Sequence, residues 1–288
     1  MKITFPISLV NKIEKPNRKI LFLKLRGGIG NQLFIYFAGV FFADRLGMKL
    51  VIDPRGVDHN ISIQKLNLPG RFISNRFFWR LTEFVVSVSP SDSLEDKSNW
   101  GRLNQMNVKN LFFLTGFFQD SYFLDQMKSF SVSIEAKNID PGIGEIDFKN
   151  TALIHIRGGD YLLHSDDIGL LDLEYYKKVT SIIVEKGIQR TYIITDDKPY
   201  AFSLLKDLEL SHVEFVDGGG LSDLDLLSSF SKFKYVFLAN STFSWWGAQL
   251  TKSDSEVYAP DIWFKARKSD VNALLMGHWK IIETGWGL

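Results

Sequence analysis

One stretch of the chain combines a cation, two glycines and an acid in a pattern suited to binding an anion. Residues 151–156 are apolar or β-branched except for His155, and they run directly into Arg157, two glycines and Asp160. Arginine presents a rigid fork of N–H donors that matches a phosphate, and glycine lets the backbone approach a ligand without a Cβ in the way. The pattern predicts a phosphate site centred on Arg157. A local pair of Arg157 with Asp160 in a surface turn is the alternative.

A second candidate phosphate contact is a glycine turn near the start of the chain. The sequence RGGIGNQLF begins at Arg26, follows the largely apolar residues 20–25, and opens an apolar segment that runs to about Leu46. A strand, a glycine turn and a helix in this order present free backbone N–H groups to a phosphate. The candidate contacts are Gly28, Gly30, Asn31 and Gln32. Close packing of the strand on the helix is the alternative reason for the glycines.

A third candidate follows a short apolar segment and consists of the sequence NSTFSWWGAQL, residues 240–250. Asn240, Ser241 and Thr242 provide N-cap oxygens and free N–H groups at the start of a helix, where the helix dipole favours an anion. Phe243 and two tryptophans come next in the chain. The pattern is consistent with an anion site, and an ordinary capped helix with buried tryptophans is the alternative.

These three motifs can meet a ligand only if they stand at the ends of strands in a sheet. In the C-terminal half of the chain, apolar segments typical of strands alternate with segments typical of helices. Strands are expected at residues 151–156, 191–197, 213–217, 235–240 and 256–260, and helices at 171–187, 199–208, 222–231 and from 242 onward. This alternation with short turns predicts a parallel, doubly wound sheet that binds ligands at the carboxyl ends of its strands.

The N-terminal half has the same kind of pattern with longer interruptions. Strands are expected at residues 20–25, 49–53 and 111–118, and helices from the glycine turn to about residue 46 and over 119–130. Residues 1–19 form a weakly patterned lead-in, and residues 55–110 lack a clear period. Residues 140–150 contain Pro and Gly and predict a linker. The predicted domains are therefore 1–140, which carries the glycine turn, and 151–288.

Composition limits the class of protein. The chain has 288 residues, of which 45% are hydrophobic and 23% charged, so it is long enough for two ordered globular domains. Its 34 basic and 33 acidic residues give a net charge of +1, which argues against nucleic-acid binding and against binding to an acidic membrane. Both partners need a clustered basic field, which these residues provide only if the two signs of charge are segregated. The chain has no cysteine, which excludes disulfides, thiolate metal sites and a cysteine nucleophile.

The apolar segments are too short to predict a membrane span. The longest covers residues 33–43, whereas a bilayer crossing needs about 20 residues. The N-terminal segment, broken by Pro6, makes a poor signal peptide. A cytoplasmic location is therefore expected, and the aromatic content of 14% would suit peripheral contact with the inner membrane or stacking on sugar rings.

Four motifs give the chain a resemblance to a known family. They are GGIGNQLF from residue 27, GFFQDSYF from 116, HIRGGDY from 155 and NSTFSWWGAQL from 240, in the order seen in glycosyltransferase family 11, the α-1,2-fucosyltransferases. The resemblance spans roughly residues 20–265 and looks like a bacterial member that builds O-antigen or other surface glycans. It implies an α/β fold of GT-B type, with two Rossmann-like lobes, of which the N-terminal one faces the acceptor and the C-terminal one binds the nucleotide sugar. It also implies GDP-L-fucose as donor substrate, a galactose-terminated acceptor, inversion, and no metal or other cofactor.

The resemblance further implies roles for individual residues. Arg157 matches the first arginine of the family's His-x-Arg-Arg-x-Asp motif, which contacts the donor pyrophosphate in related fucosyltransferases, and His155 matches the motif histidine, which lies near the guanine there. Asp225 resembles the acid that binds guanine N–H groups, with a first-turn helix acid as the alternative. The positions that approach the phosphates correspond to Asn31, Ser241, Thr242 and Phe243.

One position departs from the family motif. The second arginine is replaced by Gly158, so one positive charge expected near the donor is absent. This departure leaves a related GDP-6-deoxyhexose such as GDP-colitose as an alternative donor.

Sugar transfer without a metal needs preorganised hydrogen-bond donors that stabilise the negative charge developing on the leaving phosphate. Arg157 and the backbone amides near Asn31 and Ser241 are the candidates. A base could also take the proton of the acceptor hydroxyl, and Asp160 is the acid next to the motif, although it could instead orient Arg157 or cap the turn. The alternative bases in the following loop are His164, Asp166 and Asp167.

Two other classes of protein explain less of the sequence. A noncatalytic carbohydrate-binding protein would use tryptophans as sugar platforms, but it leaves Arg157 and the glycine turn unexplained. The candidate platforms are Trp245, Trp246, Trp263, Trp279 and Trp286. A nicotinamide oxidoreductase is disfavoured because glycines at 27, 28 and 30 do not match the dinucleotide fingerprint. No metal-ligand spacing is apparent, and Asp196-Asp197 lacks the context of a metal-binding DxD motif.

Overall fold

The computed structural model divides the chain into two compact units. The N-terminal unit is Ile3–Ser133, and the C-terminal unit is Ile134–Leu288 together with Met1–Lys2. The residues that the structure describes are 1–14, 18–55, 57, 62–80, 93–94, 110–119, 124, 133–135, 147–216, 221–266 and 274–286. The division falls earlier in the chain than the linker at 140–150 that the sequence predicts.

The C-terminal unit is built on a six-stranded parallel sheet. Its strands are β8 (Thr151–Ile156), β9 (Arg190–Thr195), β10 (Val213–Phe215), β11 (Tyr235–Phe237), β12 (Glu256–Pro260) and β13 (Lys280–Ile282). They are arranged in the order β10-β9-β8-β11-β12-β13, so the strand order numbered from β8 is 3-2-1-4-5-6, that of a Rossmann fold. The order reverses between β8 and β11, and such a switch point opens a crevice at the carboxyl ends of the two strands.

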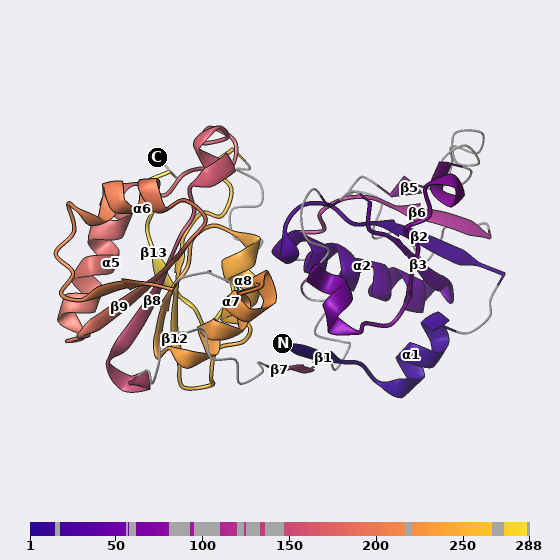
Figure 1. The fold of residues 1–288 in the computed structure, drawn as a ribbon, viewed down its shortest axis with the longest axis horizontal. Coiled ribbons are helices and arrows are strands. Elements are labelled where there is room, and N and C mark those ends of the chain that lie inside the picture. The colour runs from indigo at the N-terminus through magenta and orange to yellow at the C-terminus, as the bar shows by residue number, and fades with distance from the viewer. Residues whose placement is uncertain are drawn as a thin grey trace. The chain divides into compact units, whose positions relative to one another are not determined.

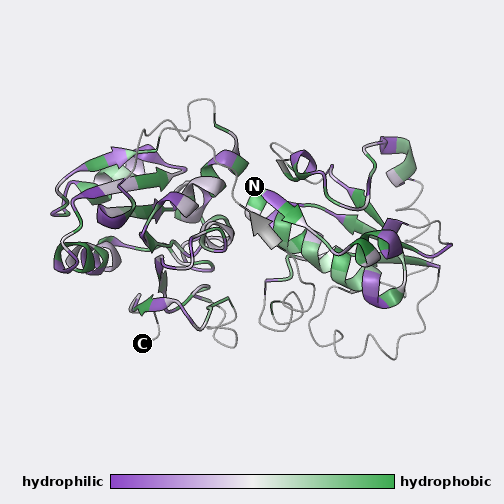
Figure 2. Cartoon of the chain, turned by 90° about the horizontal axis from the view of Figure 1, so that it is seen from below, coloured by the Kyte–Doolittle hydropathy of each residue, from purple (hydrophilic) through white to green (hydrophobic). Residues whose placement is uncertain are grey.

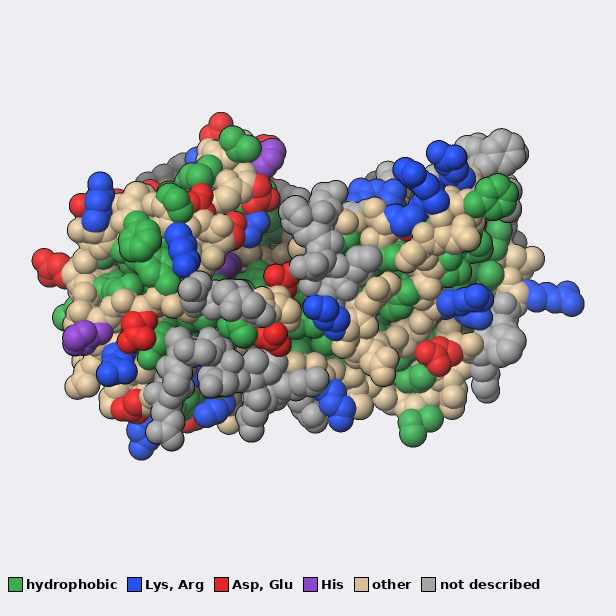
Figure 3. All heavy atoms as spheres, in the orientation of Figure 1, with side chains coloured by type: hydrophobic (Ala, Val, Ile, Leu, Met, Phe, Trp, Pro, Cys, Tyr) green, Lys and Arg blue, Asp and Glu red, His purple; other side chains and the backbone are tan. Residues whose placement is uncertain are grey.

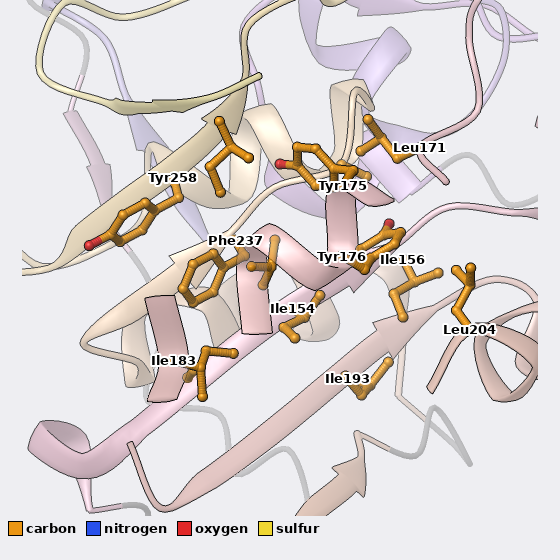
Figure 4. Close-up of a cluster of buried hydrophobic side chains, with 14 of the residues drawn as sticks. Ile154, Ile156, Leu171, Tyr175, Tyr176, Ile183, Ile193, Leu204, Phe237 and Tyr258 are labelled. Atoms are coloured by element: carbon orange, nitrogen blue, oxygen red, sulfur yellow. The ribbon is translucent and has the colours of Figure 1, made fainter. Parts of the chain in front are cut away.

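Helices cover both faces of this sheet (Figure 1). They are α5 (Leu173–Glu185) and α6 (Lys198–Leu205) on one face, and α7 (Asp223–Ser229) and α8 (Thr242–Ala248) on the other. Because strand side chains alternate between faces, Ile154 and Ile156 of β8 join Tyr176 of α5 in the core that Figure 4 shows. His155 points to the opposite face, where its ring lies 6.4 Å from that of Phe230. Every residue of β8 is buried, as expected for a strand covered on both sides.

The N-terminal unit has a smaller parallel sheet. Its strands are β2 (Ile20–Lys24), β3 (Lys49–Asp53), β4 (Arg71–Phe72), β5 (Ser93–Leu94) and β6 (Leu111–Leu114), in the order β4-β3-β2-β6-β5. The helix α2 (Ile29–Leu46) follows β2, and it is hydrophobic along most of its length in Figure 2. A helix that is apolar all round is buried, and here Gly39 lets α2 pack closely on β2, since an added Cβ would stand 2.5 Å from Leu23 Cδ2.

The lead-in predicted for residues 1–19 is wrong, because two short elements form there. They are β1 (Lys2–Thr4), which pairs with β7 (Ser133–Glu135), and the helix α1 (Ile7–Glu14). The helix buries only Leu9 and Ile13, and two apolar positions are too few to give a clear helical period in the sequence.

Other differences concern where strands end. The strand predicted over 111–118 stops at Leu114, because Gly116 and Phe118 have positive φ angles of 142° and 53°, which an extended chain does not have. β13 was not predicted. Most of the helix expected over 119–130 and much of the segment 55–110 lie outside the described residues. None of the helices in the described parts of the chain has the length and hydrophobicity that a bilayer crossing requires.

Candidate active site

The switch point of the C-terminal sheet brings two of the predicted motifs together. β8 and β11 are neighbours, with Ile154 opposite Phe237, and Arg157 and Asn240 lie three residues beyond this pair on each chain segment. The two segments are linked by the hydroxyl of Tyr161, which donates to the backbone oxygen of Asn240 at 3.1 Å. Burial raises the pKa of Tyr161 to about 12, so the hydroxyl keeps the proton that it donates.

Arg157 is held by three groups around its guanidinium. One terminal nitrogen, Nη1, lies 2.9 Å from Oδ2 of Asp196, and the other, Nη2, donates to Oδ1 of Asp160. The guanidinium carbon lies 5.0 Å from the centre of the Tyr161 ring, within the range of a cation–π contact. The Arg157–Asp160 pair that the sequence offered as an alternative to a phosphate site is therefore present, and Arg157 carries a second carboxylate partner as well.

Asp196 and Asp197 bind the backbone of the glycine pair that follows Arg157. Oδ1 of Asp196 accepts from the Gly158 amide at 3.0 Å, and Oδ2 of Asp197 accepts from the Gly159 amide at 3.3 Å. The second oxygen of Asp197 also caps α6 by accepting from the Tyr200 amide at 2.9 Å. In the sequence, Asp196 and Asp197 stand out only as a rejected metal-binding motif. Their place beside Arg157 follows from the pairing of β9 with β8, which the local sequence does not reveal.

The glycine pair is required by this contact. A Cβ at Gly158 would lie 2.8 Å from Cβ of Asp197 and 2.9 Å from Cδ1 of Tyr200, and a Cβ at Gly159, where φ is +44°, would lie 2.3 Å from Oδ2 of Asp196. A larger residue at position 158 would therefore displace the first turn of α6. The missing second arginine of the family motif has a steric reason, so an arginine introduced there would report on packing as well as on donor preference.

His155 is a buried, neutral histidine at the end of β8. Burial, with a smaller effect from the charge of Arg157, lowers its pKa to about 3. Its ring lies 5.4 Å from that of Phe243, and its Nδ1 has no hydrogen-bond partner among the described residues. A neutral imidazole offers one hydrogen-bond donor and one hydrogen-bond acceptor, and the edge of a nucleobase could bind to both.

The predicted residues at the end of β11 stabilise their own surroundings. The side-chain nitrogen of Asn240 donates to the backbone oxygens of Ile168, Gly169 and Trp263 at 3.2, 3.0 and 3.3 Å. Ser241 caps α8, because its hydroxyl oxygen accepts from the Phe243 amide at 3.3 Å. Thr242 is the first residue of that helix. The capped helix that the sequence gave as the alternative is thus present.

Asp225 also has a local role. One of its oxygens, Oδ2, accepts from the backbone amide and the hydroxyl of Ser222, at 3.0 and 2.8 Å, at the start of α7. This is the arrangement of a first-turn helix acid. Its other carboxylate oxygen is the one through which a guanine contact would have to be made.

The glycine turn of the N-terminal unit is stabilised by two amide side chains. Gln32 donates to the backbone oxygen of Gly27 at 2.9 Å, and Asn31 accepts from Gln119 at 2.9 Å. Gly27 has a φ of +67°, whereas Gly28 precedes α2 with ordinary angles and a Cβ there would meet nothing within 4 Å. Gly30 lies within the first turn of α2. Gly27 is thus required by the turn itself, and the structure gives no internal reason for Gly28.

The tryptophans proposed as sugar platforms are mostly buried. Trp245, Trp246, Trp263 and Trp279 are each no more than 5% exposed, and Trp286 packs against the loop at Gly169. A platform needs an exposed ring face, so the structure does not support this use. Among the residues that the structure describes, no group of three or more His, Asp or Glu side chains could hold a metal ion.

The architecture and the comparisons with known proteins agree. Two α/β units with parallel sheets, one of them in Rossmann order, confirm the predicted GT-B-like fold class. The model of a family described as glycosyl transferase family 11 matches residues 88–283, and the chain belongs to this family of enzymes.

Two curated relatives are similar over most of their length. One is an alpha-1,2-colitosyltransferase of Escherichia coli, 25% identical over 85% of this chain and 93% of the relative. The other is the O-antigen biosynthesis glycosyltransferase WbnK of Escherichia coli, 27% identical over 88% and 98%. A solved structure of a family 9 glycosyl transferase from Veillonella parvula covers 95% of this chain and 87% of its own, with a TM-score of 0.50 and 10% identity, and it shares the fold.

Proposed function

We propose that this glycosyltransferase moves L-fucose from GDP-L-fucose, or colitose from GDP-colitose, to the 2-hydroxyl of a galactose-type acceptor, with inversion and without a metal. The main support for a nucleoside diphosphate sugar as donor substrate is the guanidinium of Arg157. It is held at the switch point of a Rossmann-ordered sheet, which is where such sheets bind nucleotides. The names of the two relatives support a deoxysugar donor and a role in bacterial surface glycan synthesis.

Arg157 would meet the charge that develops on the leaving diphosphate. Its two carboxylate partners differ in exposure, because the side chain of Asp160 is 59% exposed and that of Asp196 is 29% exposed and bound to the Gly158 amide. The diphosphate would therefore replace Asp160, while Asp196 continues to orient the fork. Once displaced, Asp160 would be free to take the proton from the hydroxyl group of the acceptor sugar. The alternative bases remain His164, Asp166 and Asp167.

Other donor contacts are part of the proposal. His155 would bind the guanine as a neutral ring, Asp225 would use its second carboxylate oxygen, and Phe243 would lie beside the nucleotide. The backbone groups of Asn240, Ser241 and Thr242 complete the set in the C-terminal unit, and Gly28, Gly30, Asn31 and Gln32 are the proposed phosphate contacts of the glycine turn. The C-terminal unit would thus bind the nucleotide sugar, the N-terminal unit would bind the acceptor, and the cytoplasmic location stays a prediction.

The proposal is tested by GDP release from GDP-fucose and GDP-colitose in parallel, against a panel of galactose-terminated acceptors, with and without EDTA. We expect acceptor-dependent release with one of the two donors, a product linked at the 2-hydroxyl, and the same rate in EDTA. Loss of activity in EDTA that manganese restores would contradict the metal-independent mechanism. If GDP were released from neither GDP-fucose nor GDP-colitose, the result would contradict the proposed class of donor substrate.

A further inference from the structure

The two units carry opposite charge. The 34 Lys and Arg residues divide equally, with 17 in Ile3–Ser133 and 17 in the remainder, whereas 10 of the 33 Asp and Glu residues lie in the first and 23 in the second. The formal charges are therefore +7 for the N-terminal unit and −6 for the C-terminal unit. The net charge of +1 conceals this difference, so the N-terminal unit alone can attract an anionic surface.

One segment of the N-terminal unit concentrates this charge. Residues 62–80 contain four basic residues and no acidic residue. The basic residues, all exposed, are Lys65, Arg71, Arg76 and Arg80. None of them forms an ion pair with another described residue. Figure 3 shows Lys and Arg side chains gathered on one part of this unit.

An exposed aromatic ring belongs to the same helical segment as two of these arginines. Residues 76–80 are helical, and Asn75 caps the turn by accepting from the backbone amides of Phe77 and Phe78. Trp79 faces inward, where its ring lies 5.5 Å from that of Phe22 of β2. Phe77 points outward and is 77% exposed. The inner face therefore fixes the helix, while Phe77 projects outward from the same helical segment as Arg76 and Arg80.

We propose that residues 62–80 form a docking surface, defined by Lys65, Arg71, Arg76, Phe77 and Arg80, that binds the N-terminal unit to an anionic lipid bilayer. The charge of the unit favours a negatively charged partner, and an exposed aromatic ring with arginines on the same helical segment matches the boundary between lipid headgroups and acyl chains. A bilayer accepts both features at once, because the ring enters the apolar layer while the guanidinium groups stay among the phosphates. The binding is peripheral and reversible.

The expected strength follows from these two contributions. Each basic side chain near an anionic surface raises the affinity by about fivefold, and the entry of a phenylalanine ring raises it by roughly tenfold or more. The charge contribution falls with ionic strength, since the Debye length shrinks from about 10 Å at 0.1 M salt to about 3 Å at 1 M. The surface therefore gives salt-sensitive binding that depends on one aromatic ring.

The test is cosedimentation of the full chain with vesicles, using phosphatidylcholine alone or with phosphatidylglycerol. We expect binding only to the vesicles that contain phosphatidylglycerol, and release as salt is raised. Phe77→Ala is expected to weaken binding about tenfold, and Arg76→Gln with Arg80→Gln about 25-fold. These side chains are exposed, so the melting temperature should not change.

The C-terminal unit offers a matched control. Phe202 of α6 is 57% exposed and has Lys198 and Lys206 four residues before and after it, but it belongs to the acidic unit. Phe202→Ala is expected to leave vesicle binding unchanged. Binding to neutral vesicles as strong as to anionic ones, a loss with Phe202→Ala as large as with Phe77→Ala, or no vesicle binding by the wild-type chain would overturn the proposal. The last result would leave an acidic protein as the partner of this surface.

Discussion

At the scale of single residues, Arg157 is the group on which the proposed chemistry depends. Its guanidinium is oriented before any ligand binds, because Asp196 and Asp160 each contact a different terminal nitrogen. Preorganised donors of this kind stabilise developing charge without having to rearrange during the reaction. The predictions at this scale concern the arginine and the acid that orients it.

Replacing Arg157 should reduce turnover far more than it reduces stability. Arg157→Ala removes one donor to the leaving diphosphate, which typically costs about a hundred- to a thousandfold in rate, and Arg157→Lys should restore little because the fork is lost. Turnover numbers from GDP release provide the measurement. Arg190→Ala, which removes an exposed arginine at the start of β9, is the control and should keep full activity. Near-normal turnover of the alanine variant would exclude this role for Arg157.

Asp196 and Asp197 should differ in their effect on turnover although they are adjacent. Asp196→Asn keeps an acceptor for the Gly158 amide but removes the charge that faces Arg157, so we expect a fall in turnover of about tenfold or more. Asp197→Asn should lower the melting temperature, with a smaller effect on turnover, because Asp197 binds the Gly159 amide and caps α6.

A double substitution measures directly whether Asp196 affects turnover through Arg157. In the Arg157→Ala background, Asp196→Asn should cause little further loss, since the group through which it acts is gone. If Asp196→Asn lowered turnover by the same factor in the wild-type and Arg157→Ala backgrounds, Asp196 would act on the fold alone.

At the scale of elements, Glu256 connects one helix end and two strands of the C-terminal unit. Its carboxylate, at the start of β12, accepts from Lys186 at the end of α5 at 3.1 Å, from Tyr258 at 2.9 Å, and from Lys280 of β13. Burial alone would raise the pKa of Glu256, but the hydrogen bonds from Lys280, Lys186 and Tyr258 outweigh it and lower the pKa to about 2.

This lowered pKa predicts a stability that depends on pH. A carboxyl group whose pKa is lower in the folded state stabilises the fold above its unfolded value, near 4.5, and this contribution is lost as the pH falls toward about 2. Glu256→Gln should therefore lower the free energy of unfolding by about 1 kcal/mol at pH 7, and the difference from wild type should shrink as the pH approaches 3. Urea unfolding at several pH values gives the measurement.

The control for Glu256 is Glu174 on the surface of α5. Its partner is Lys177, one turn along the same helix, and its side chain is 73% exposed. Exposed pairs of this kind contribute little, so Glu174→Gln should leave the free energy of unfolding unchanged at every pH. A constant difference between Glu256→Gln and wild type from pH 7 to pH 3 would show that the carboxylate charge is not responsible.

At the scale of the whole molecule, each unit has its own parallel sheet and its own core. Units of this kind unfold as separate cooperative transitions when few interactions couple them. GDP at about a hundred times its dissociation constant adds roughly 2.7 kcal/mol to the unit that binds it, which corresponds to a shift in melting temperature of about 5–10 °C. Most of the proposed GDP contacts lie in the C-terminal unit, so calorimetry of the full chain should show that GDP raises the transition of this unit most.

The moving transition can be assigned to a unit by a substitution. Glu256→Gln weakens the C-terminal unit only, so it should lower the same transition that GDP raises. If GDP instead raised the transition that Glu256→Gln leaves unchanged, the nucleotide would bind the N-terminal unit, and the proposed division of roles between the lobes would be reversed.

The sequence by itself determined the main elements and the family. The strands at 151–156, 49–53 and 256–260 were predicted to the residue, because each is a short, largely apolar run next to residues that end strands. Four motifs in order were enough to identify the family that the family model confirms. The sequence also placed Arg157 at the end of a strand, since the change from apolar residues to charge and glycine is local.

Only the tertiary structure decided what those residues contact. Asp196 and Arg157 are far apart in the chain and meet because β9 pairs with β8, an order that no local pattern encodes. The same holds for Asn240, whose amide serves a loop some 70 residues away, and for the tryptophans, whose burial depends on the elements around them. Local sequence fixes periodicity and turn chemistry, whereas the partner of a polar side chain is fixed by which strands become neighbours.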